Sequence, residues 1–317
     1  MEYKEYDFKS VNKNNLSVLS LSQSVELERR ICELAELATI TADEIVPLLN
    51  DNYSIYEIVE MLRDTAYEPN YALHKDVLEQ NQKRIGAYLG SISSNDKGIF
   101  AQLLVNFLEE KKHKISELDF LPSEKGEETV TYVKNKLSDE AYDVFSQEMH
   151  DPRVLYSSSF RDAALAVANG KTRFCILPFE DAGGSRIFGI EQLIFKYDLK
   201  VNSITPVFGV DGTADMKYAL VSKYFFVPEF SPDDDRYLEI KVMEGGSAEL
   251  LDVITAAGAI GIEVYRVNTL RIDFGEGERS GFTLVLKKTG KEFVDMLAYL
   301  AFFCDSHTVI GIYKNLE

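Results

Sequence analysis

The stretch SFRDAALAVANGKTRFCILPFEDAGGSRIFGIEQLIFK, residues 159–196, contains the pattern that decides the fold. Its alanine-rich first part is predicted to be a helix, and the helix ends at Asn169-Gly170, a pair typical of a left-handed helix stop. The apolar run 174–177 predicts a buried strand. A polar loop and a second predicted helix, 189–197, follow it. Strands that alternate with helices of this length indicate an α/β unit.

The same alternation continues on both sides of this stretch, over residues 128–228. The other strands of the unit are predicted at 129–133, 154–156, 201–207 and 218–221, with a further helix at 139–147. The segments LPSEKGEE and PEFSPDDDR, at 121–128 and 228–236, combine proline with charge. Such segments are typical of domain boundaries.

The third predicted domain, residues 236–317, has a different order of elements. Strand 237–242, helix 247–257, strands 262–272 and 282–286, helix 291–304 and strand 308–313 follow one another. This βαββαβ order is typical of a ferredoxin-like domain, in which two helices cover one face of a four-stranded antiparallel sheet.

The first 121 residues are predicted to form a helical domain, because apolar residues such as Leu27, Ile31 and Leu34 recur at helical spacing. Thr41 followed by two acids is predicted to start a helix, with a kink or break at Pro47. The fold class is therefore multidomain: α, then α/β, then α+β.

Composition limits the classes of partner. The chain has 317 residues and a formal charge of −18, which disfavours nucleic acid and anionic membranes as partners. No secretion signal or apolar run of membrane-spanning length is present, so a cytoplasmic protein is expected. Three scattered cysteines predict reduced thiols, and four isolated histidines predict no metal site. No cofactor is predicted.

The loop after the 174–177 strand is the candidate site. Glu180, Asp181, Ser185 and Arg186 lie between a strand end and a helix start, where α/β sheets place ligands and where backbone N–H groups attract a carboxylate. Arg186 adds a bidentate partner for that anion. The alternative is an ordinary turn that carries an Arg–Glu pair at the surface.

The segment 159–186 resembles the first lobe of prephenate dehydratase. In that family a Phe-x-x-Ala helix, a glycine turn and a loop with the pattern "(I/L)P-x-E-N-S-x-x-G-(S/R)-V" follow in this order. Glu180 falls on the family glutamate, whereas Asp181 and Ser185 replace its asparagine and glycine. Upstream, Ser138 matches a serine of the family's opening "G-x-x-G-S-Y-S-x-x-A". The resemblance implies a ligand site at these residues.

The third domain resembles the regulatory ACT domain that follows the catalytic part in this family. The closing VIGIY, 309–313, is similar to the family's "LGSYP". Residues at the phenylalanine-binding "GAL" turn and at the effector-binding "ESRP" segment would form the effector site: Gly246, Ser247, Ala248, Leu250, Asn268, Thr269 and Leu270. The resemblance implies a small carboxylate or amino acid as ligand, and a homodimer or higher oligomer formed through this domain.

Two departures from the family bear on activity. The family's catalytic Thr-Arg-Phe falls on Met216, Lys217 and Tyr218, and a thioether cannot supply the proton of a hydroxyl. The chain also lacks the length of the family's second lobe. We therefore expect a non-catalytic relative that senses or binds a small carboxylate or amino acid linked to phenylalanine biosynthesis.

Other functions stay open. The first alternative is an active prephenate dehydratase, a lyase. The second is a chorismate mutase, an isomerase, in which basic residues of the N-terminal helices bind a dicarboxylate: Arg29, Arg30, Lys83 and Arg84. The third is an assembly module that pairs through its ACT-like domain. Charged helix faces usually meet solvent, which disfavours the mutase site. A further hypothesis is that the N-terminal helices cover the place of the missing lobe.

Overall fold

The structure is a computed structural model, and it describes residues 21–50, 53–55, 57–59, 89–90, 92–121, 127–208, 214–226, 233–246, 248–273, 278–289 and 293–316. Its strands are β1 Thr129–Tyr132, β2 Arg153–Tyr156, β3 Phe174–Asp181, β4 Lys200–Phe208, β5 Ala214–Ser222, β6 Asp235–Met243, β7 Glu263–Asp273, β8 Glu278–Thr289 and β9 His307–Lys314. Its helices are α1 Leu21–Asn50, α4 Lys97–Glu110, α5 Lys136–Phe145, α6 Phe160–Ala168, α7 Phe188–Lys196, α8 Leu250–Ile260 and α9 Val294–Phe303. Short 3₁₀ turns lie at η3 Glu117–Asp119 and η4 Ser146–Glu148.

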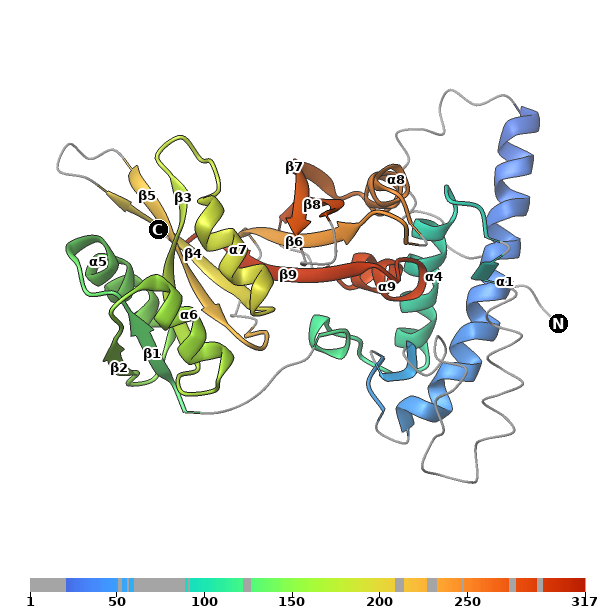
Figure 1. The fold of residues 1–317 in the computed structure, drawn as a ribbon. Helices are drawn as coiled ribbons and strands as arrows, with labels where there is room; N and C mark the ends of the chain where they lie inside the picture. Colours follow the sequence, from blue (N-terminus) through green and yellow to red (C-terminus); the bar gives the residue numbers. More distant parts are fainter. Residues whose placement is uncertain are drawn as a thin grey trace.

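The strands form one nine-stranded mixed sheet in the order β2-β1-β3-β5-β4-β9-β6-β8-β7. Strands β1, β2 and β3 are parallel, whereas β5 is antiparallel to both β3 and β4. The last four strands pair antiparallel, and β9 joins the two halves by pairing in parallel with β4 at Val201 and Gly311. Figure 1 shows β9 running from α9 toward β4, with the C-terminus among the strands of the first half.

Local sequence signals explain the helix ends. The Asn135 side chain accepts a hydrogen bond from the Ser138 backbone N–H at the start of α5, and the Ser159 side chain does the same for Asp162 at the start of α6. Gly261 ends α8 in the left-handed conformation, with φ of 81°. The predicted strands and helices from 129 to 313 coincide with described elements, with ends shifted by a few residues.

The N-terminal prediction was wrong at two residues. Thr41 does not start a helix; it lies inside the 30-residue helix α1, where its hydroxyl donates to the Leu37 carbonyl. The predicted break at Pro47 is also absent, because α1 continues through it to Asn50; Pro47 removes one helical hydrogen bond, that to the Asp43 carbonyl, and only three residues of the helix follow it.

The described N-terminal helices pack on the end of the molecule away from β1–β5. Helix α4 lies between α1 and the pair α8 and α9 (Figure 1). Gly98 allows close contact, because a Cβ there would lie 3.0 Å from the Ala256 carbonyl oxygen, and Phe100 meets Phe303 edge to face at 5.7 Å. The hypothesis that these helices cover the place of the missing lobe is therefore wrong for the described residues.

The sheet and the helices that cover its two faces form three apolar cores. The largest joins α1 and α4 to α8, α9 and one face of β6–β9. A second lies under α6 and α7 and includes residues of both sheet halves, among them Tyr237, Val285 and Tyr313. The third lies on the opposite face of β1–β5, under α5. The second core holds the junction of the two halves together.

Candidate functional site

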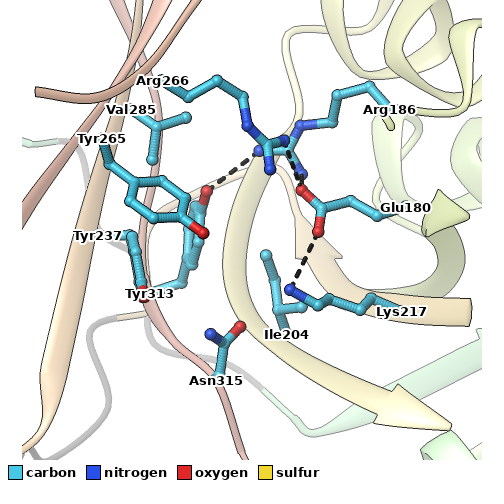
Figure 2. A pocket seen from close by; sticks show the side chains of 10 residues that line it. All are labelled: Glu180, Arg186, Ile204, Lys217, Tyr237, Tyr265, Arg266, Val285, Tyr313 and Asn315. Carbon is cyan, nitrogen blue, oxygen red and sulfur yellow. Dashed lines mark hydrogen bonds and ion pairs between the residues drawn. The ribbon is translucent and has the colours of Figure 1, made fainter. Parts of the chain in front are cut away.

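A buried cluster of charged side chains lies where the two halves of the sheet meet. Glu180, at the end of β3, has a side chain that is only 6% exposed. Its Oε1 lies 2.8 Å from Nη1 of Arg266 on β7 and 3.1 Å from Nη1 of Arg186, and its Oε2 lies 3.1 Å from Nζ of Lys217 on β5. One carboxylate thus contacts three cations from both halves of the sheet (Figure 2).

Arg186 connects this carboxylate to a second one. Its Nη2 donates to Oε2 of Glu239 at 2.5 Å and to the Tyr313 hydroxyl oxygen at 3.2 Å, and Tyr313 itself donates to Glu239 Oε2 at 2.8 Å. The guanidinium also stacks on Phe179, with its Cζ 3.6 Å from the ring centroid. The side chains of Arg186 and Glu239 are 8% and 3% exposed. The predicted alternative of a surface Arg–Glu pair was therefore wrong, because the pair is buried.

The protonation states follow from these contacts. Burial raises the pKa of Glu180, but Arg186 and Lys217, with the hydrogen bond from Arg266, outweigh it, and the pKa lies below its ordinary value. Burial and then the charge of Glu239 raise the pKa of Tyr313 well above its ordinary value, so the phenol keeps its proton. At neutral pH, Glu180 is an anion and Tyr313 a donor.

A small, open pocket with a cavity volume of about 20 Å³ lies beside this cluster. Figure 2 shows Glu180 and Lys217 on one side of it and three tyrosines on the other, with Arg186 and Arg266 between them. The complete lining is Glu180, Arg186, Ile204, Lys217, Tyr237, Tyr265, Arg266, Val285, Tyr313 and Asn315.

The aromatic side of the pocket is continuous. The Tyr237 ring stacks on Tyr313 at 5.7 Å and meets Tyr265 edge to face at 5.4 Å. The Lys217 and Arg266 side chains are 33% and 25% exposed, so each is only partly covered by protein beside the opening. Basic donors that face an aromatic surface suit a small carboxylate with a flat apolar body.

The rest of the predicted loop is used within the protein. The Asp181 carboxylate accepts hydrogen bonds from the backbone N–H groups of Gly183 and Ser185, both at 2.9 Å. The expectation that this loop offers unoccupied N–H groups to a ligand was wrong for those two, because Asp181 satisfies them. Glu180 and Arg186 line the pocket, whereas Asp181 and Ser185 shape the turn that joins them.

The three residues of β5 that the resemblance aligned with a catalytic Thr-Arg-Phe do not share one face of the sheet. Lys217 lies on the pocket side of β5, but its neighbours Met216 and Tyr218 belong to the core on the opposite face. Tyr218 is 2% exposed and Ser138, with which it shares a hydrogen bond, is fully buried. The face that carries Met216 and Tyr218 is therefore covered by α5, the helix that contains Ser138.

The predicted effector residues lie along the C-terminal strands, from beside the pocket to the far end of the sheet. The register places Met243 of β6, Gly281 of β8 and Leu270 of β7 side by side, near the turn at Gly246. From Met243, Tyr237 of the pocket lies six residues along β6, roughly 20 Å away. Asn268, in contrast, lies only two residues along β7 from Arg266 of the pocket. Ala248 is buried and Leu250 starts α8, while Ser247 lies outside the described residues.

The basic residues proposed for a mutase site do not converge in the described helices. Arg29 is 57% exposed and pairs with Glu26 and Glu33 of its own helix, and Arg30 pairs with Asp96. Lys83 and Arg84 lie outside the described residues.

Within the described ranges, no group of three or more His, Cys, Asp or Glu side chains is placed to hold a metal ion. Of the helices described, none has the length and apolar character needed to cross a membrane.

Sequence reasoning missed the contributions of the C-terminal half to this site. Glu239, Arg266 and the tyrosines lie on strands whose alternate positions are polar, a pattern typical of a solvent-facing side. A glutamate in the middle of a strand is uncommon, and Glu239 was therefore the one feature of the sequence that could have indicated this half of the site.

Comparison with known proteins gives only distant structural similarities. No family model and no curated protein matches the chain. Prephenate dehydratase from Streptococcus mutans is 12% identical with a TM-score of 0.46, over 60% of this chain and 99% of that one. An Arthrobacter aurescens prephenate dehydratase in complex with L-Phe is 11% identical with a TM-score of 0.43, over 58% and 89%. GqqA, described as a novel type of quorum quenching acylase, is 16% identical with a TM-score of 0.42, over 60% and 96%.

Proposed function

We propose that this chain is a prephenate dehydratase-like protein without dehydratase activity that binds a small carboxylate or amino acid in the pocket at the junction of the two sheet halves. The observation that carries the proposal is the pocket itself, in which Lys217 and Arg266 face three tyrosines. A volume of about 20 Å³ admits a group little larger than a water molecule, so the carboxylate enters the pocket and the rest of the ligand stays outside it.

The opposite face of the same sheet, under α5, supports the absence of dehydratase activity. Ser138 on α5 is fully buried, Tyr218 belongs to the apolar core there, and Met216 packs against that core. Catalysis by proton transfer requires a donor within hydrogen-bond reach of the substrate, and Met216 has no such group.

The C-terminal elements support an ACT-like regulatory unit. They follow in βαββαβ order, and the strand order β9-β6-β8-β7 places the first and last strands of the unit next to each other, with α8 and α9 on one face. In this chain the other face of that unit forms the aromatic side of the pocket, so ligand binding there involves the regulatory unit directly.

Thermal denaturation with ligands tests the proposal. Phenylpyruvate, prephenate, chorismate, phenylalanine and tyrosine are each added to the purified chain. A ligand at ~100 times its Kd adds about 2.7 kcal/mol to the free energy of unfolding. We expect a carboxylate to raise the melting temperature, and turnover of prephenate to phenylpyruvate to be absent.

Two matched variants place the binding site. Lys217→Met is expected to abolish the shift, whereas Lys223→Met, which removes the same charge from an exposed position beyond the end of β5, is expected to keep it. A shift that survives Lys217→Met, or measurable turnover of prephenate, would contradict the proposal.

A further inference from the structure

Lys241 of β6 is a half-buried lysine that forms no ion pair with any described residue. Its register partners are Thr283 of β8 and Thr308 of β9, so the three side chains lie on one face of the sheet. Helix α7 covers this face, and the Lys241 Nζ lies 5.3 Å from the ring centroid of Phe195 on that helix. An amine in this place has lost part of its water without gaining a counter-ion.

The carboxylate that acts on Lys241 is already held by a second lysine. The Asp198 Oδ1 lies 2.7 Å from the Nζ of Lys200 on β4, and the same Nζ donates to the Val309 carbonyl oxygen at 3.2 Å. Asp198 is 74% exposed, so water screens its charge. Within the described residues, Asp198 and Lys200 are the charged groups whose fields act on Lys241, and two cations therefore share one carboxylate.

The charged groups of the elements packed against Lys241 are engaged elsewhere. Glu191 of α7 interacts with Glu239 and Arg186. Glu239, two residues before Lys241 on β6, pairs with Arg186. Lys196 of α7 is exposed, and its Nζ lies over a neighbouring tyrosine ring. None of these groups supplies the missing negative charge.

These surroundings favour the uncharged form of the amine. Burial lowers the pKa of Lys241 below its ordinary value; Asp198 opposes this change, and Lys200 adds to it. An uncharged amine has a free lone pair and is a nucleophile, whereas an ammonium group is not. Beside it, the fully buried Thr283 hydroxyl has no hydrogen-bond partner in the described part of the chain, so it is available as a donor to a carbonyl oxygen on Lys241.

We propose that Lys241 is a modification site, acylated at Nζ by small acyl phosphates. The nitrogen attacks the acyl carbon, the N–C bond forms as the C–O bond to phosphate breaks, and the amine proton leaves with the phosphate. The amide product is uncharged, so acylation removes a half-buried cation that lacks an ion pair. An anionic donor is favoured because the local charge is positive. Lys241 does not line the pocket, and the inference is independent of the proposed function.

Acetylation of the full chain by acetyl phosphate tests the inference. Peptide mass spectrometry follows the extent of acetylation at each lysine over time. At about pH 7.5 we expect Lys241 to react about threefold faster than the exposed Lys223, because more of its amine is uncharged. The ratio of the two rates is expected to fall toward about pH 10, where an ordinary lysine also loses its proton.

Two variants identify the cause. Lys200→Met removes the cation that disfavours the Lys241 ammonium and leaves Asp198 to it, so the rate at Lys241 is expected to fall about fivefold, the effect of a unit charge several ångströms away in a partly solvated site. Lys196→Met removes the same charge from an exposed position next to Phe195, and it is expected to leave the rate unchanged.

If Lys200→Met does not fold, Asp198→Asn gives a test of the opposite sign. It removes the exposed carboxylate, and asparagine tolerates the φ of 48° at this position. The rate at Lys241 is expected to rise about two- to fivefold in this variant.

Three results would overturn the inference. The first is equal rates at Lys241 and Lys223 at about pH 7.5, and the second is a ratio that does not change with pH. The third is a Lys196→Met chain that slows as much as Lys200→Met, because the rate would then follow the net charge of the chain and not the surroundings of Lys241.

Discussion

Replacing Gly311 with alanine is expected to weaken the junction between β4 and β9. Gly311 lies between two strands, because its register partners are Val201 on one side and Glu239 on the other. A Cβ at this position would lie 2.5 Å from the Val201 carbonyl oxygen and 2.8 Å from the Val201 Cβ. The first of these atoms belongs to the backbone, so it cannot rotate away.

The size of the effect follows from that clash. Bringing the 2.5 Å contact to 3.0–3.4 Å requires strand β4 to move by 0.5–0.9 Å, the difference between those distances. Overpacking of this kind costs about 1–3 kcal/mol, and the lower entropy of the unfolded chain with alanine returns about 0.4–1 kcal/mol. We expect a net loss of about 1–2 kcal/mol.

Urea unfolding followed by circular dichroism measures the loss. Gly258→Ala is the matched control, because no atom lies within 4 Å of the added Cβ and the position is inside helix α8. That variant is expected to be stabilised by about 0.5–1 kcal/mol. A Gly311→Ala chain that unfolds at the wild-type urea concentration or above would refute the close contact of β4 with β9.

Two further predictions concern buried acids. Glu117 and Arg236 are 6% and 3% exposed and pair at 2.5 Å, and Glu117 also accepts from the Phe293 backbone N–H. Glu117→Ala is expected to cost about 3–5 kcal/mol in urea unfolding, whereas Glu117→Leu combined with Arg236→Met should cost far less; equal losses would contradict this. Burial and then the charge of Glu239 raise the pKa of Glu191 above its ordinary value, so its carboxylate destabilises the fold at neutral pH. Glu191→Gln is expected to raise the melting temperature at pH 7, and the gain should vanish as the pH falls through the raised pKa to below about 4; a gain that persists at low pH would show a different cause.

Local patterns predicted the elements from 129 to 313 because their signals lie within a few residues. A helix cap such as Asn135, a stop such as Gly261 and an apolar run such as that of β3 each act on their own segment. The prediction that Thr41 starts a helix was wrong because a threonine hydroxyl can also donate to a carbonyl inside a helix. In α1 it donates to the Leu37 carbonyl.

The sequence allowed only one half of the candidate site to be predicted, the half that contains the loop after β3. Glu180 and Arg186 stood out as a pair near a strand end, but the residues that bury them come from β6, β7 and β9. Glu239 and Arg266 are separated from Glu180 by 59 and 86 positions, differences between their residue numbers. No periodicity within one segment indicates such a contact, which follows from the β4–β9 pairing instead.

The pocket and the junction of the two halves are parts of one structure. The N-terminal half supplies Glu180 and Lys217, and the C-terminal half supplies Glu239 and Arg266, so separating the halves would take Glu239 from Arg186 and Arg266 from Glu180. A carboxylate held by both Lys217 and Arg266 would bridge β5 and β7. By thermodynamic linkage, the free energy by which the ligand stabilises the contact between the two halves equals the free energy by which that contact strengthens ligand binding. Gly311→Ala acts on the junction without touching a charged group, so it is expected to weaken the binding of a carboxylate such as phenylpyruvate as well as stability.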